Sequence, residues 1–212
     1  MKNSPKIKKL VEQSNNLMID NRWADAIDIL KKLLKEFPSS IPLLTNLSLC
    51  HANTAAFEEA HELIDKAEEL QPLNVTTKHV KAFCYESEEK FDLAIEGYKK
   101  CLKIDKDHYD SWIRSAAILR KKNDLDQALN ILNHVYKNIK KTPEVATDIG
   151  VVLYEKGDLE NAEKILNQSL TVKNRSEIIA KQYLSKIYHQ DSKKKHLAIK
   201  IDRELEGLID LS

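Results

Sequence analysis

The sequence predicts an all-α protein, an α-solenoid of about six similar helix–turn–helix units. Three observations lead to this prediction: alanines spaced 34 residues apart, further columns in register with them, and a shortage of turn-forming residues. Four glycines and five prolines in 212 residues are too few for a chain with many tight turns. This composition favours long helices joined by short corners.

An alanine ladder sets the period. Its five members lie 34 residues apart, at Ala26, Ala60, Ala94, Ala128 and Ala162. Large apolar residues stand three positions before each alanine, at Trp23, Phe57, Phe91, Leu125 and Leu159. Others stand four positions after it, at Leu30, Ile64, Tyr98, Leu132 and Leu166. Such spacings put the apolar residues on one face of a helix, so each unit is expected to contain a helix, a short break and a second helix.

The breaks between the helices recur with the same period. Asn123-Asp124 and Gly157-Asp158 occupy one turn in two successive units. Thr142 can cap a helix whose first turn holds Pro143, where the missing N–H costs nothing. Ser4-Pro5 offers the same start to the first helix.

The 34-residue unit with these columns resembles the tetratricopeptide repeat family. The small residue that the family places between paired helices corresponds to the alanine ladder, and a second small column lies in the first helices, at Ser14, Ser48, Ala82, Ala116 and Gly150. The resemblance implies a right-handed superhelix in a single domain, 1–212. We place its repeats at 7–40, 41–74, 75–108, 109–142 and 143–176.

A degenerate sixth repeat with a capping helix is expected over 177–212. His196 stands where the ladder predicts a small residue, and Ala198 restores the pattern after a two-residue insertion. The last segment puts apolar residues on one stripe, at Leu197, Ile201, Leu205, Leu208 and Ile209. A terminal repeat of a solenoid needs a cap with a polar outer face, which fits this helix.

Charge and hydropathy argue against binding to nucleic acid, insertion into a membrane and secretion. Lys+Arg 34 nearly cancels Asp+Glu 33, so a net charge of +1 gives no long-range attraction to nucleic acid. No stretch approaches 18 apolar residues, and direct membrane insertion is not expected. The N-terminus has no apolar run typical of a secretory signal, and three cysteines without CxxC spacing do not suggest disulfides. We therefore expect a cytoplasmic protein.

The residues that could carry chemistry have structural explanations. Cys50 and Cys84 lie 34 residues apart at one small position of successive first helices, and Cys101 falls in an apolar column of a second helix. The seven histidines show no HxxxH or HExxH spacing, and His51 fills an apolar column. The glycines are scattered singly, so no phosphate loop is present. We expect no metal, no cofactor and no enzyme activity.

A binding groove is implied by the resemblance, because the family lines its concave surface with the first helix of each repeat and binds extended peptides or helices there. The groove residues expected on this basis are Asn15, Asn46, Leu49, His79, Phe83, Ile113, Ala117, Arg120, Val151 and Tyr154. Many of them are apolar for a surface that faces water, which is typical of interaction sites. The alternative is that some of these side chains tilt into the core between helices.

One subclass of the family can be tested directly. Co-chaperone members hold a C-terminal carboxylate with lysine, arginine and asparagine. Asn15 and Asn46 match the asparagine positions, but Val11, Thr76 and Val80 stand where the basic residues belong. A carboxylate is not held firmly without a cation, so this subclass is rejected.

The function expected from the sequence is a non-enzymatic adaptor that binds a peptide or an amphipathic helix of a protein partner. The main alternative is a self-assembling scaffold, a homo-oligomer of the magnetosome-associated kind, in which the N-terminal helix inserts into the groove of another copy. An accessory module of a secretion, pilus or envelope complex also stays open.

Overall fold

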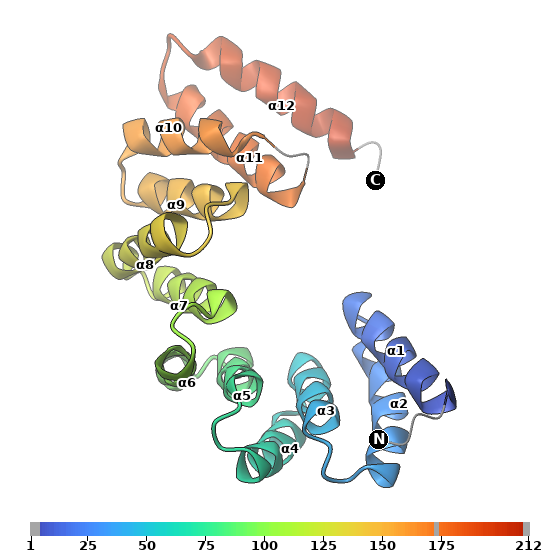
Figure 1. The fold of residues 1–212 in the computed structure, drawn as a ribbon. Coiled ribbons are helices and arrows are strands. Elements are labelled where there is room, and N and C mark those ends of the chain that lie inside the picture. Colours follow the sequence, from blue (N-terminus) through green and yellow to red (C-terminus); the bar gives the residue numbers. More distant parts are fainter. Residues whose placement is uncertain (1–4, 172–173, 210–212) are drawn as a thin grey trace. The chain divides into compact units, whose positions relative to one another are not determined.

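The chain is all-α, as predicted. The computed structural model describes residues 5–171 and 174–209, and the side chains as far as residue 207. Within these residues it contains twelve α-helices and no strand (Figure 1). Residues 210–212, the end of the predicted sixth repeat, lie outside the described residues, as does the predicted capping residue Ser4.

Contacts between Cα atoms divide the chain into two compact units, unit 1 over Met1–Ser111 and unit 2 over Trp112–Ser212. Unit 1 contains α1 (Pro5–Ile19), α2 (Trp23–Glu36), α3 (Ile41–Asn53), α4 (Phe57–Leu70), α5 (Val75–Ser87) and α6 (Phe91–Ile104). The division falls within α7 (Tyr109–Lys121), and α8 (Leu125–Asn138), α9 (Pro143–Glu155), α10 (Leu159–Ser169), α11 (Arg175–Gln190) and α12 (Lys195–Ile209) follow in unit 2. The single domain over 1–212 stays a prediction.

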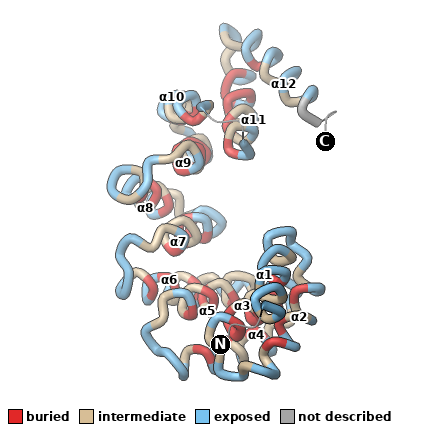
Figure 2. The backbone as a smooth tube through the Cα atoms, turned by 45° about the vertical axis from the view of Figure 1, so that its right-hand side comes forward, coloured by how far each residue is buried: buried red, intermediate tan, exposed pale blue. Residues whose placement is uncertain are grey.

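The core of both units is built from the small-residue columns. All five alanines of the ladder are 0% exposed. The second column is buried as well, at Ser14, Ser48, Ala82, Ala116 and Gly150. Figure 2 shows buried positions along the helices and exposed positions at most turns between them. Small side chains in both columns let the two helices of a repeat approach closely, and large apolar residues such as Leu30 and Ile64, both 0% exposed, fill the space beside them.

The turn inside each of the first five repeats adopts one recurring backbone conformation. Among the residues that the structure describes, five have positive φ, at Asn21 (57°), Ala55 (59°), Glu89 (59°), Asn123 (62°) and Gly157 (83°). They are spaced 34 residues apart, so the period appears in the backbone as well as in the core. Glycine and asparagine tolerate the left-handed conformation, whereas alanine and glutamate are strained in it by roughly 1–2 kcal/mol.

We expect Gly157→Ala to lower the free energy of unfolding by about 1 kcal/mol, because alanine is strained at this φ. A Cβ on Gly157 would meet no heavy atom within 4 Å, so the cost comes from the backbone alone. The matched variant Ala55→Gly removes the same strain and should raise stability by up to about 1 kcal/mol. Urea unfolding measures the change in unfolding free energy for both variants. If both variants were stabilised, or both destabilised, backbone strain would not explain the effect.

Three successive helices of unit 2, α8, α9 and α10, begin with a side-chain cap, and of these the cap at Thr142 was expected. Thr142 accepts a hydrogen bond from the backbone N–H of Val145 at 3.4 Å, with Pro143 in the first turn of α9. Asp124 and Asp158 accept from the backbone N–H groups of residues 127 and 161 in the same way. Each such bond satisfies a donor that the first helical turn leaves without a partner.

The sixth helix pair follows the predicted insertion. Ala198 is 0% exposed and occupies the small position in α12, while His196 is exposed. Ile201 packs against the core that α11 contributes to, but Leu197 is 36% exposed and lies at the edge of the predicted stripe. The side chains of Leu208 and Ile209 lie outside the described residues.

Candidate protein-binding surface

In unit 1, contacts between successive first helices place part of the predicted groove on a common face. The Asn46 Nδ2 of α3 donates to the Asn15 Oδ1 of α1 at 3.4 Å. Asn15 is exposed and Asn46 is half-buried. These two amides therefore meet at the surface, on neighbouring first helices.

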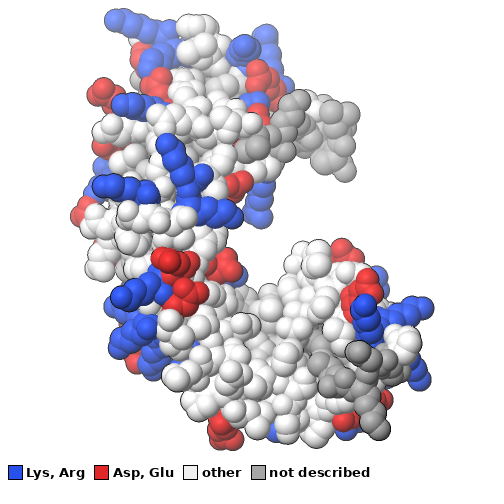
Figure 3. Space-filling view, viewed as in Figure 1, with Lys and Arg blue, Asp and Glu red and all other residues white. Residues whose placement is uncertain are grey.

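Leu49 of α3 and Phe83 of α5 provide the apolar part of this face. Both side chains are half-buried and pack against the core cluster that contains Leu44, Ile64 and Cys84. One side of each side chain packs against this buried cluster, and the other side remains at the surface. Figure 3 shows a broad area without charged side chains over the middle of unit 1.

His79 lies at a junction of several side chains. Its ring packs against Tyr98, with centroids 5.3 Å apart, and against His108, with centroids 5.0 Å apart. The Nδ1 atoms of His79 and His108 both lie within hydrogen-bonding distance of the Ser111 Oγ, at 3.2 and 2.8 Å. His79 is half-buried, so it helps to pack the end of unit 1 as well as facing the surface.

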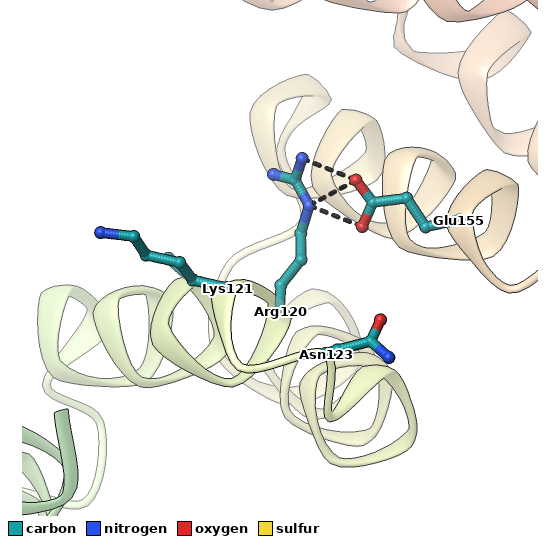
Figure 4. A pocket seen from close by; sticks show the side chains of 5 residues that line it. Arg120, Lys121, Asn123 and Glu155 are labelled. Atoms are coloured by element: carbon teal, nitrogen blue, oxygen red, sulfur yellow. Dashed lines mark hydrogen bonds and ion pairs between the residues drawn. The ribbon is translucent and has the colours of Figure 1, made fainter.

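In unit 2, Arg120 of α7 is paired with Glu155 of α9 (Figure 4). The Nε donates to Oε2 at 2.8 Å and the Nη2 donates to Oε1 at 2.8 Å, a bidentate geometry. The pair lines an open hollow of about 650 Å³, to which Ala117, Lys121 and Asn123 also contribute. The predicted residues Ala117 and Arg120 are both exposed there.

An aromatic pair extends this face onto α11. The Tyr154 and Tyr183 rings meet edge to face, with centroids 5.1 Å apart. The Lys186 Nζ lies 4.3 Å from the centre of the Tyr183 ring, and the Gln190 Nε2 donates to the Tyr154 hydroxyl at 3.4 Å. Aromatic side chains with a polar end are typical of binding surfaces. Tyr183 and Lys186 were not among the predicted residues, because the sixth repeat is degenerate in sequence.

A narrow recess of about 40 Å³ lies beside the predicted residue Ile113. It shares Ala117 and Arg120 with the wider hollow, and Asp148 of α9 provides its carboxyl group. Burial raises the pKa of Asp148 to about 6, against a smaller opposing effect of Arg120. Sequence reasoning missed Asp148, although it stands 102 residues after Asn46 in the same column of the repeat, three periods of 34 later.

The prediction needs correction at Val151, which is only 2% exposed. Its position in α9 turns toward the interior of the unit, so Val151 belongs to the core and not to a groove. Ile7, Leu10 and Val11 of α1 likewise pack against the core cluster of their own unit. An N-terminal helix inserted into another copy would have to give up this packing.

The cysteines are structural in character. Cys50, Cys84 and Cys101 are free thiols and 0% exposed. Burial raises the pKa of Cys50 and of Cys84 to about 11, which disfavours the reactive thiolate. Across residues 5–171 and 174–209 no three His, Cys, Asp or Glu side chains gather as a metal site would require, and no helix is long and apolar enough to cross a membrane.

Comparison with known proteins identifies the family. Two models described as tetratricopeptide repeat match the chain, one over residues 17–76 and the other over residues 75–108 and 143–175, together more than half of its length. The chain belongs to the tetratricopeptide repeat family. The tetratricopeptide repeat-containing protein trd-1 of Caenorhabditis elegans is 23% identical over 119 residues, which make up 56% of this chain and 15% of that relative. The chain thus spans a small part of the relative's length.

Solved structures share the fold. The Thermus thermophilus protein TTC0263 matches with a TM-score of 0.70 and 15% identity, over 84% of this chain and 97% of that one. MamA matches with a TM-score of 0.60 and 16% identity, over 74% and 92%. YrrB, described as a protein of this family with an unusual peptide-binding site, matches with a TM-score of 0.56 and 16% identity, over 81% and 88%. Membership of the tetratricopeptide repeat family supports a protein–protein interaction module.

Proposed function

We propose that the chain is a non-enzymatic adaptor whose first helices bind a peptide or an amphipathic helix of a partner protein. In unit 1 the binding surface is formed by Asn15, Asn46, Leu49 and Phe83, with His79 at its end. In unit 2 it is formed by Ile113, Ala117, Arg120 and Tyr154, extended by Tyr183. The peptide-binding site named for YrrB agrees with this use of the fold.

The observation that supports the proposal most is the exposed apolar and amide surface of unit 1. Leu49 and Phe83 are held half-buried by the core beneath them, so they are pre-ordered and lose little side-chain entropy on binding. The Asn15 and Asn46 amides beside them can hydrogen-bond to the backbone of an extended or helical segment. This combination suits a segment with an apolar anchor.

A random peptide library displayed on phage, selected on the immobilised chain, provides the test. Synthetic copies of the enriched peptides are then measured by fluorescence anisotropy. We expect Phe83→Asp to weaken their binding at least tenfold, because a carboxylate replaces the apolar anchor. Leu93→Asp is the matched control, since Leu93 is 46% exposed on the second helix α6 and should leave affinity unchanged.

A second variant guards against misfolding of the first. Asn15→Trp fills the surface from an exposed position and does not disturb the core. Peptides that bind both folded variants as tightly as the native chain would overturn the proposed surface. A molar mass in light scattering that grows with concentration, with no enriched peptides, would instead favour the self-assembling scaffold. Ile19 and Leu73, 77% and 75% exposed, are the apolar side chains that such assembly would cover.

A further inference from the structure

Unit 2 contains a carboxyl group that no neighbouring side chain neutralises. In the described part of the chain Asp148 makes neither a hydrogen bond nor an ion pair through its side chain. It lies in the recess of about 40 Å³, which is otherwise lined by Ile113, Ala116, Ala117, Leu132, Val152 and Arg120. Apart from Arg120 these are apolar side chains, and a carboxylate among them lacks the solvation that water would provide.

Arg120 lies close but is engaged elsewhere. Its Nε and Nη2 both donate to Glu155, in a bidentate pair. Burial raises the pKa of Asp148, Arg120 lowers it by a smaller amount, and the charge of Glu144 raises it further. The recess as a whole favours an added positive charge, because Glu155 already balances Arg120.

The size and lining of the recess restrict the cation. A volume of about 40 Å³ exceeds the roughly 10–15 Å³ that a cavity needs to hold one water molecule, and an ammonium group is of similar size to water. The walls formed by Ile113 and Val152 suit the methylene chain of a lysine, which can lie along apolar surface with its charged end at Asp148. The wider hollow lined by Ala117 and Arg120 leaves room for the backbone that carries the lysine.

We infer that the recess at Asp148 is a subsite for a lysine ammonium group of the bound partner segment. The inference rests on the proposed function, because the lysine belongs to the segment that lies on unit 2. Asp148 accepts the ammonium as an ion pair, and Arg120 stays with Glu155. The subsite would select basic segments although the chain has a net charge of only +1.

The subsite can be tested without knowing the partner. The probe is N-acetyl-lysine N-methylamide, and its matched control is the norleucine analogue, which has no ammonium group. Both are titrated at pH 7 into the full chain, with NMR detection of the Asp148 carboxyl carbon and the Ile113 and Ala117 methyl groups. We expect the lysine amide to cause saturable chemical-shift changes and the norleucine analogue to cause none. At saturation with the lysine amide, the pKa of Asp148 should fall toward its ordinary value.

Two variants decide the assignment. Asp148→Asn should weaken binding of the lysine amide at least fivefold, whereas Asp126→Asn should leave it unchanged. Asp126 is an exposed carboxylate of the same unit, paired with Lys156 and absent from the recess. Equal shifts from both amides, or equal binding to Asp148→Asn and the native chain, would overturn the subsite.

The outcomes for the subsite and for the proposed function are separable. Selected peptides that lose affinity with Phe83→Asp, together with a lysine amide that leaves Asp148 unaffected, would overturn the subsite and support the adaptor. A lysine amide that binds at Asp148, together with a failed peptide selection, would support an ammonium site in the recess and overturn the adaptor whose bound segment was to supply the lysine.

Discussion

Replacing Asp148 with asparagine is expected to stabilise the chain by about 2–3 kcal/mol at pH 8. Burial raises the pKa of Asp148 from 3.8 to about 6, so ionisation is costlier in the folded state than in the unfolded state. The folded state holds the proton more tightly, and its stability falls as the pH rises from about 4 through 6. Asparagine is neutral at every pH and keeps the shape of the side chain. The variant therefore does not lose folding stability as the pH rises.

The measurement is urea unfolding of the variant and the native chain between pH 4 and pH 8. The difference in unfolding free energy should be smallest near pH 4, where Asp148 is protonated in the folded state and about half protonated in the unfolded state, and should level off above pH 7. The exposed Asp126→Asn substitution is the control and should show no such rise. A difference that stays constant with pH would mean that the carboxyl group is well solvated.

Gly150→Ala is expected to lower the free energy of unfolding by up to about 2 kcal/mol. A Cβ at this position would lie 2.5 Å from the Leu166 Cγ and 2.6 Å from its Cδ2, and Leu166 is itself 0% exposed. Overpacking of this kind typically costs about 1–3 kcal/mol, and it must outweigh the roughly 1 kcal/mol that alanine gains over glycine in a helix.

Gly207→Ala is the matched control for this substitution. Gly207 also lies within a helix, but a Cβ there would meet no heavy atom within 4 Å. It should therefore gain up to about 1 kcal/mol from helix propensity. Thermal unfolding of both variants gives the comparison, and a Gly150→Ala protein as stable as Gly207→Ala would show that α9 and α10 can move apart at little cost.

The fold could be predicted because its determinants are periodic. A column that repeats every 34 residues can be recognised in the sequence, and the alanine ladder proved to be fully buried. The insertion before Ala198 was also recognisable, because only a small residue fits between paired helices. The strained turns at Ala55 and Glu89 were not expected, since neither residue type is a signal for positive φ.

The candidate surface was less predictable. A periodic pattern shows roughly which face of a helix a residue lies on, but only to within part of a turn. Val151 and Tyr154 lie three residues apart on one helix, yet Val151 is buried and Tyr154 reaches the surface. The pairing of Arg120 with Glu155 and the exposure of Asp148 to a recess depend on side-chain conformations. Such details are set by neighbouring helices and not by the repeat.

The recurring turn also bears on how the chain opens locally. Its non-glycine, non-asparagine members, Ala55 and Glu89, both belong to unit 1, whereas unit 2 uses Asn123 and Gly157 at the equivalent places. Backbone strain in the folded state lowers the free energy needed to open the surrounding segment. Local unfolding therefore begins more readily at the turns between α3 and α4 and between α5 and α6. These turns adjoin the helices that carry Leu49 and Phe83.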